Sequence, residues 1–278
     1  MIRGMYSAIS GLKEHQVMLD VTANNLANVN TIGYKASRAT FKDQLQQNFS
    51  GGAASGPTSG GQNAQQVGLG VTLSSIDNLI TGGALQTTGN PLDVAISGEG
   101  WFRVGQFDAG GNLTNVQYSR AGNFTRNDQG DLVNSEGFYV LKADPAAPAD
   151  PTKGQKINVP AGSSGVTIAS DGTVSYIPQG AQTRTSGGQI SLAKFANENG
   201  LVRVSGNRWQ EDPSSGTPTV GVPGTDFGTT VGGTLESSNV DLANEFTQMI
   251  VAQRGFQANS RVISTSDEML QDLVNLKH

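Results

Sequence analysis

The sequence predicts a mixed α and all-β fold, in which paired N- and C-terminal coiled-coil helices accompany a central β-rich domain. Apolar residues recur at heptad spacing near both termini, and short apolar runs cut by turn residues fill the middle. The composition agrees, since the 278 residues include 37 glycines but are only 6% aromatic and 15% charged. Such a composition favours many short strands and turns over a compact helical enzyme.

The N-terminal segment has the pattern of one coiled-coil helix. Apolar residues alternate at spacings of three and four and define a narrow seam on a helix of about seven turns. The seam consists of Ile2, Met5, Ile9, Leu12, Gln16, Leu19, Ala23 and Leu26. Val17 and Val21 lie off this seam, which gives the helix a second, partly apolar flank for further neighbours.

The C-terminal segment continues the same spacing over about five heptads. Ser238 followed by Asp241 resembles a capping box at the start of this helix. Because neither helix can bury its seam alone, we expect the two to pair; the alternative is that each packs on the central domain as an ordinary amphipathic helix. The seam consists of Leu242, Phe246, Met249, Gln253, Phe256, Ser260, Ile263, Asp267, Leu270 and Val274.

Three divisions follow from these patterns. Residues 1–30 and 236–278 are expected to form one discontinuous helical domain. Residues 31–70 are expected to be a linker, because the stretch 50–66 contains nothing larger than glutamine or proline to pack. Residues 71–235 alternate short apolar runs with glycine-containing turns, which predicts a β-rich sandwich or barrel-like domain.

Composition excludes several classes of function. A net charge of −5 with no cluster among the 18 Lys and Arg residues argues against nucleic acid and anionic membranes as partners. No apolar run reaches the roughly 18 residues of a membrane span. The absence of cysteine excludes disulfides, thiolate metal sites and a cysteine nucleophile. The N-terminus lacks the pattern of a cleaved secretory signal, so these rules alone predict a cytosolic protein.

No catalytic, metal or cofactor site is expected. His15 lies off the apolar seam, and the sequence has no G-x-S-x-G motif whose serine it could activate as a general base. A solvated histidine is therefore the favoured interpretation. The stretch 127–131 has the oxygen density of a calcium loop but lacks the spaced acids and final glutamate, which favours a hairpin turn. Gly98-Glu99-Gly100 precedes a strand pattern rather than a helix, which favours a bend over a phosphate loop.

The stretch from Leu19 to Lys35, LDVTANNLANVNTIGYK, resembles the N-terminal signature of the flagellar rod and hook protein family. Four more blocks agree with the same family, at residues 89–102, 118–124, 238–241 and 249–259. The signature positions are Asn24, Asn25, Leu26, Ala27, Asn28, Thr31, Gly33 and Tyr34.

The resemblance implies an inner tube of paired terminal helices, an outer β domain, and export through the flagellar type III apparatus without a cleaved signal. The protein would then be extracellular, in the hook or basal body. Phe41 and Leu45 resemble an export element, with a plain packing pair as the equal alternative. The residues expected to carry self-assembly are Ile2, Met5, Ile9, Leu12, Leu19 and Leu26 against Leu242, Phe246, Met249, Phe256, Ile263 and Leu270.

Within this family, the short hook protein of Gram-positive bacteria is the predicted match, on hook-like features at residues 67–71, 86–89 and 267–277. Such a subunit would polymerise with itself and contact distal rod, hook cap and hook–filament junction proteins. The overall length, however, is that of a distal rod protein, which is the first alternative. A secreted β-rich adhesin or carbohydrate-binding module is the alternative from another class.

Overall fold

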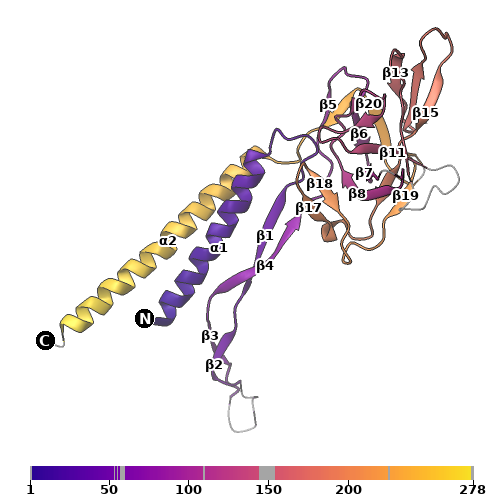
Figure 1. The fold of residues 1–278 in the computed structure, drawn as a ribbon. Coiled ribbons are helices and arrows are strands. Elements are labelled where there is room, and N and C mark those ends of the chain that lie inside the picture. The colour runs from indigo at the N-terminus through magenta and orange to yellow at the C-terminus, as the bar shows by residue number, and fades with distance from the viewer. Residues whose placement is uncertain are drawn as a thin grey trace. The chain divides into compact units, whose positions relative to one another are not determined.

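The computed structural model describes residues 2–276 except 53, 55, 57–59, 109, 144–153 and 225 (Figure 1). The chain forms two compact units from interleaved stretches. The first, here called the terminal unit, comprises Met1–Ala27, Ser37–Asn78 and Asp241–His278. The second, here called the β unit, comprises Asn28–Ala36 and Leu79–Val240. The domain boundaries predicted after residues 30, 70 and 235 stay a prediction.

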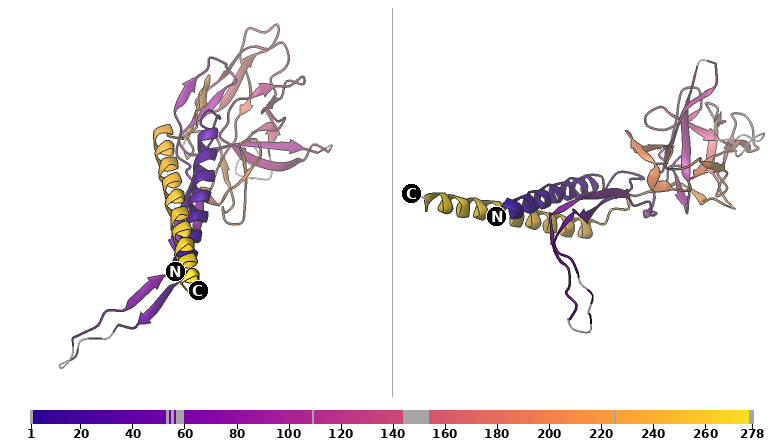
Figure 2. Two further views of the ribbon diagram at one scale, coloured as in Figure 1. Left: turned by 90° about the vertical axis from the view of Figure 1, so that its left-hand side faces the viewer. Right: turned by 90° about the horizontal axis from the view of Figure 1, so that it is seen from below.

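In the terminal unit, α1 (Ile2–Ala27) and α2 (Leu242–Asn275) pack against each other, so the predicted pairing of the two chain ends is confirmed. Figure 2 shows them side by side, with both chain termini near the same end of the pair. Asp241 is the N-cap of α2, and its Oδ1 accepts from the backbone N–H groups of Ala243 and Asn244. A carboxylate here also complements the positive end of the helix dipole.

Residues 31–70, predicted to be a linker, contain paired strands. β1 (Ser37–Asp43) pairs antiparallel with β4 (Val71–Asn78), and β2 (Gln46–Ser50) pairs with β3 (Gln65–Gly68). These strands form a two-stranded ribbon in the terminal unit. The largely polar residues of β2 and β3 carry little strand signal of their own. Backbone pairing with residues 15 to 41 positions away in the chain stabilises the ribbon.

The β unit is β-rich, as predicted. Its strands are β5 (Leu85–Thr87), β6 (Val94–Ser97), β7 (Trp101–Phe107), β8 (Leu113–Ser119), β9 (Thr125–Arg126), β10 (Leu132–Val133), β11 (Tyr139–Lys142), β12 (Gln155–Lys156), β13 (Ser164–Ile168), β14 (Thr173–Ile177), β15 (Thr185–Gln189), β16 (Leu192–Lys194), β17 (Val202–Val204), β18 (Arg208–Gln210), β19 (Thr219–Gly221), β20 (Thr229–Gly232) and β21 (Thr234–Glu236), with a 3-10 turn at Glu198–Gly200.

The largest sheet of the β unit runs in the order β17-β18-β8-β7-β11-β10-β9. β16 joins it beside β7 and is followed by β19, while β12 pairs with β11. Smaller sheets are β13-β14-β15, β20-β6 and β21-β5, and all strand pairs reported for this unit are antiparallel. Antiparallel neighbours joined by tight turns explain why glycine-containing turns recur along this part of the sequence.

Two apolar clusters hold the β unit together. The first includes Val94, Phe102, Leu132 and Ile190, all 0% exposed. The second is built around Trp101 and Trp209, whose rings meet edge to face with centroids 5.5 Å apart. Both tryptophans are fully buried, so their role is in packing the core, where large aromatic side chains contribute most.

Candidate assembly surface

Three close contacts fix the register between α1 and α2. A Cβ on Gly11 would lie 2.7 Å from Nδ2 of Asn259, and a Cβ on Gly255 would lie 2.4 Å from Nε2 of His15. Nδ2 of Asn25 donates to Oε1 of Glu245 at 3.1 Å. The residue numbers in each pair add up to 270, so the two helices run antiparallel in one constant register.

The interface between the helices is shifted by one residue from the predicted seam. The fully buried positions of the two helices are small or polar and lie one residue before predicted seam positions. A one-residue shift turns the buried face by about 100°. Small side chains and glycines occupy this buried face because they let the two helix backbones approach closely. The buried positions are Ala8, Thr22 and Asn25 in α1, and Glu245, Ala252 and Ser266 in α2.

The larger apolar residues of the predicted seam therefore lie at the edge of the intrachain interface. Leu242 and Phe246 are 44% and 50% exposed. Ile2 belongs to α1, but its side chain lies outside the described residues. The other assembly candidates are half-buried, namely Met5, Ile9, Leu12, Leu19 and Leu26 in α1 and Met249, Phe256, Ile263 and Leu270 in α2.

Further apolar side chains of α1 and α2 are exposed. Ile250, Val251, Val262 and Leu273 are between 44% and 57% exposed, and Tyr6 of α1 is 67% exposed. At 100° per residue, Val251 and Val262 lie on the opposite edge of the buried face from Leu242 and Phe246, so exposed apolar side chains occur at both edges of the interface. The self-assembly role of the predicted seam residues stays a prediction.

Asn25 is the signature residue whose structural role is clearest. It is 1% exposed, and its amide pairs with the backbone of Ser37: Nδ2 donates to the carbonyl at 2.8 Å and Oδ1 accepts from the N–H at 2.9 Å. Nδ2 also contacts Glu245, a largely buried carboxyl whose pKa is raised by burial, against the opposing effect of Asn25. Asn25 thus joins α1, β1 and α2 inside the terminal unit.

Gly33 is required by backbone geometry. Its φ is +66°, and a Cβ there would lie 2.6 Å from the backbone nitrogen of Ala121. The neighbouring Tyr34 is buried and lies under the guanidinium of Arg203, with 4.6 Å between the Arg203 Cζ and the ring centroid. Thr31 donates from Oγ1 to Oδ1 of Asn28 at 3.1 Å and closes the turn after α1.

The remaining signature residues belong to the end of α1. Leu26 is half-buried, whereas Asn24 and Ala27 are exposed. The signature therefore combines a helix end, a turn and an extended segment, and each part has a local structural reason.

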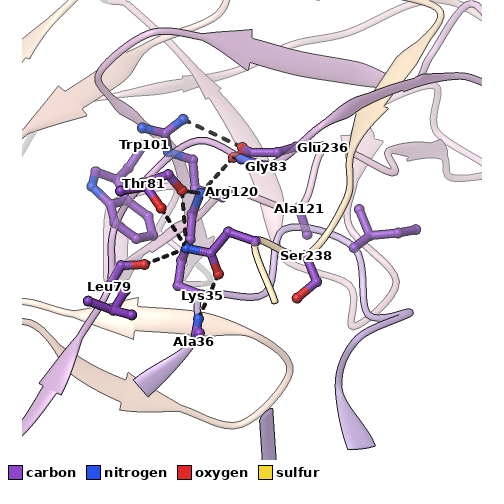
Figure 3. A network of polar contacts seen from close by, with 12 residues as sticks. Lys35, Ala36, Leu79, Thr81, Gly83, Trp101, Arg120, Ala121, Glu236 and Ser238 are labelled. Carbon is purple, nitrogen blue, oxygen red and sulfur yellow. Dashed lines mark hydrogen bonds and ion pairs between the residues drawn. The ribbon is translucent and has the colours of Figure 1, made fainter. Parts of the chain in front are cut away.

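The same signature ends in a buried ion cluster that the sequence did not predict (Figure 3). Lys35 is 0% exposed, and its Nζ donates to Oε1 of Glu236 at 2.6 Å and to the carbonyl of Thr81 at 2.7 Å. Oε2 of Glu236 lies 3.5 Å from Nη1 of Arg120, and Oε1 also accepts from the N–H of Gly83. Burial lowers the pKa of Lys35, and the attraction of Glu236 opposes this effect.

This cluster orders the stretches of the β unit that lead into the terminal unit. The N–H of Ala36 donates to Oδ1 of Asn239, and Nδ2 of Asn239 donates to the carbonyl of Leu79. The N–H of Leu79 donates to the carbonyl of Ala36, and Nη2 of Arg203 donates to that of Lys35. Three chain stretches more than 40 residues apart are thereby hydrogen-bonded together. The positive charge of Lys35 at the end of the signature was the only sequence signal for this cluster.

Phe41 lies in β1 and is 38% exposed, while Leu45 follows that strand and is 79% exposed. A residue so exposed makes little packing contact, which weakens the alternative of a plain packing pair. The export role itself stays a prediction.

No catalytic or metal-binding constellation occurs among the described residues. No group of three or more His, Asp and Glu side chains gathers in the part of the chain that is described. His15 is half-buried against Gly255 rather than solvated, because the glycine leaves room for its ring. The stretch 127–131 forms a turn with Gly130 at φ +87°, as predicted. None of the described helices is both long and apolar enough to cross a membrane.

Two packed terminal helices with exposed apolar side chains, together with a β-rich unit, are typical of a structural protein that assembles with other chains. Comparison with known proteins gives the particular family. Residues 5–35 match "Flagella basal body rod protein", residues 95–176 match "Flagellar hook protein FlgE/F/G D1 domain", and residues 231–276 match "Flagellar basal body rod FlgEFG protein C-terminal". The chain belongs to this flagellar rod and hook protein family.

Individual relatives differ in their sequence identity to this chain, and the rod proteins are more similar than the hook protein reported below. The flagellar basal-body rod protein FlgG of Bacillus subtilis is 46% identical over 279 residues, covering all of both chains. The FlgG of Agrobacterium fabrum is 40% identical, covering 96% of this chain and 97% of that protein. In Borreliella burgdorferi, the rod protein FlgG is 33% identical and the hook protein FlgE 27%, the latter over a 448-residue alignment.

These identities favour the rod alternative over the hook prediction. The hook prediction depended on short stretches at residues 67–71, 86–89 and 267–277, whereas these identities compare the whole length of the chain. The chain length had also pointed to a rod protein.

Proposed function

We propose that this protein is a distal rod subunit of the flagellar basal body, a structural axial protein that polymerises into a stiff tube. The observation that carries the proposal is the 46% identity to a flagellar basal-body rod protein over the full length of both chains. The exposed apolar surface of the paired terminal helices supports it, because such a surface in a polymer is covered by neighbouring copies.

The terminal helices form the inner wall in this proposal, and the β unit faces outward. The predicted seam residues at the edge of the helix pair, such as Phe246 and Leu242, then contact neighbouring subunits rather than their own chain. Heterologous contacts that do not close on themselves produce a helical tube. The β1–β4 ribbon belongs to the helical unit, so the tube wall includes residues 37–78 as well as the helices.

The partners and location follow from the same proposal. The subunit is exported by the flagellar type III apparatus without a cleaved signal, with Phe41 and Leu45 as the export element. It then joins other axial proteins of the rod, and its distal end receives the hook. Its place is the basal body outside the cytoplasm. The secreted adhesin or carbohydrate-binding module has no supporting observation in the structure.

Electron cryotomography of cells lacking the gene tests this assignment. For a distal rod subunit, the mutant basal bodies should have a shortened rod and no hook. Complementation with the intact gene should restore both, and a chain lacking residues 1–30 should not. Mutant cells with a complete rod and no hook would instead identify a hook subunit, and normal flagella would exclude an axial role.

A further inference from the structure

The largest sheet of the β unit has an open edge along β19. Within the described part of the chain, β19 pairs with β16 and with no second strand. A strand with one free edge presents backbone N–H and C=O groups that another extended chain can pair with. Pro218 precedes β19 and has no N–H group, so the backbone donors along this edge begin at Thr219.

Two hollows lie beside this edge. The first, of about 560 Å³, is lined by residues of β16 and β19, and the second, of about 410 Å³, adjoins it at Thr217. Val220 and Phe195, each 4% exposed, give the first hollow an apolar floor. Phe227 forms one of its walls, in the space that Gly221 leaves by having no Cβ. The two hollows together are called the β19 groove below.

The β19 groove is acidic. Asp226 lines the first hollow, and Glu211 and Asp212 line the second. Lys194 is the one base among the described lining residues, and it forms an ion pair with Glu99. A lysine- or arginine-containing chain therefore matches the groove in charge, whereas an acidic chain is repelled.

We propose that the β19 groove binds an extended, basic segment of a partner protein, which adds as a further strand to the free edge of β19. This contact lies within the β unit and is separate from the polymeric function proposed above. Backbone hydrogen bonds to the added strand supply part of the affinity in this kind of binding, and the hollows that receive alternate side chains supply the specificity.

The exposure pattern along the groove agrees with an added strand. Thr217 and Thr219 are exposed, whereas Pro218 and Val220 are buried, so the chain already alternates between the core and the groove. β19 itself has only three residues and offers few backbone hydrogen bonds. Charge should therefore contribute much of the affinity, and binding should weaken as the salt concentration rises.

Fluorescence anisotropy of a labelled synthetic peptide tests the proposal. The probe is a seven-residue peptide that alternates valine with lysine, and it is titrated with the full-length, unpolymerised chain. One matched peptide replaces every lysine by glutamate, and a second carries N-methyl groups on its three central backbone nitrogens. On the protein side, Asp226→Lys reverses a charge of the groove, and Asp128→Lys reverses an exposed charge in the turn at residues 127–131 as the control.

The lysine peptide should bind, and both matched peptides should bind about tenfold more weakly. The glutamate peptide loses charge complementarity, and the N-methylated peptide loses backbone hydrogen bonds. Asp226→Lys should weaken binding of the lysine peptide about threefold, because the lost attraction is between exposed charges. Asp128→Lys should leave it unchanged.

Three results would overturn the proposal. The first is that the lysine peptide does not bind, and the second is that either matched peptide binds as well as it does. The third is a dimer of the unmodified chain, detected by sedimentation, that Asp226→Lys abolishes, since a second copy would then occupy the groove. None of these results bears on the proposed rod function, which the gene deletion tests separately.

Discussion

Lys35 and Glu236 form a buried ion pair between residues 201 positions apart in the chain. Ionised groups pay a large desolvation cost when buried, and their attraction offsets it only when further hydrogen bonds complete the geometry. Thr81, Gly83 and Arg120 supply those contacts here. Removing one partner would leave the other buried charge poorly compensated. The pair therefore favours this one fold, whether or not it raises the free energy of unfolding.

Lys35→Met should destabilise the β unit by about 3 kcal/mol, because Glu236 keeps only a 3.5 Å contact with Arg120 as its ionic partner. Lys194→Met is the matched control, since Lys194 pairs with Glu99 on the surface and its loss should change stability little. Urea unfolding followed by tryptophan fluorescence measures both, because Trp101 and Trp209 lie in this unit. Equal midpoints for the two variants would refute the structural role of Lys35.

Glu245 makes the stability of the terminal unit depend on pH. Burial raises its pKa above the ordinary value of 4.5, so between these two values the folded chain holds more protons than the unfolded chain. The contribution of this group to stability is therefore greatest below pH 4.5 and is lost as pH rises through the raised pKa. Glu245→Gln keeps an acceptor for Asn25 and cannot ionise.

The variant Glu245→Gln should consequently gain stability relative to the unmodified protein as pH rises from 4.5 to 7. The measurement is thermal unfolding of the helices, followed by circular dichroism, for both proteins across that range. A difference that stays constant with pH, or grows toward acid, would show that Glu245 does not titrate in this way.

At the scale of elements, glycine decides how closely α1 and α2 approach. Gly255 lies against the ring of His15, and Gly11 lies against Asn259. A helix interior ordinarily disfavours glycine by about 1 kcal/mol relative to alanine, so these glycines cost helix propensity. Close packing of the two backbones compensates for this cost, and it explains why the intrachain interface uses small residues instead of the heptad leucines.

Gly255→Ala should destabilise the helix pair by about 1–3 kcal/mol, because the new Cβ would lie within 2.5 Å of two ring atoms of His15. Gly4→Ala in α1 is the control, because nothing lies within 4 Å of a Cβ at that position. It should stabilise the helix by about 0.5–1 kcal/mol through helix propensity alone. Circular dichroism during unfolding distinguishes the two signs, and a stabilising effect of both changes would disprove the close contact.

At the scale of the whole molecule, the two units differ in what holds them together. Both large apolar clusters belong to the β unit. The terminal unit buries few large side chains and leaves much of its apolar surface open. In a polymer, neighbouring copies would cover that surface, so the stability of the terminal unit in an isolated chain is expected to be low.

An isolated chain should accordingly unfold in two transitions. Far-ultraviolet circular dichroism reports mainly on α1 and α2, whereas tryptophan fluorescence reports only on the β unit, which contains Trp101 and Trp209. The circular dichroism transition should come first in urea. Coincident transitions would show that the two units unfold as one cooperative block.

Local patterns along the sequence predicted the terminal helices, the β-rich middle and the family. Each of these depends on local patterns: heptads, strand-and-turn alternation, and a contiguous motif such as the one ending at Lys35. The tertiary structure alone decided the one-residue shift of the helix interface, the β1–β4 ribbon and the Lys35–Glu236 pair. The physical reason is that each arises from groups far apart in the chain, whose contact depends on backbone approach and burial rather than on local spacing.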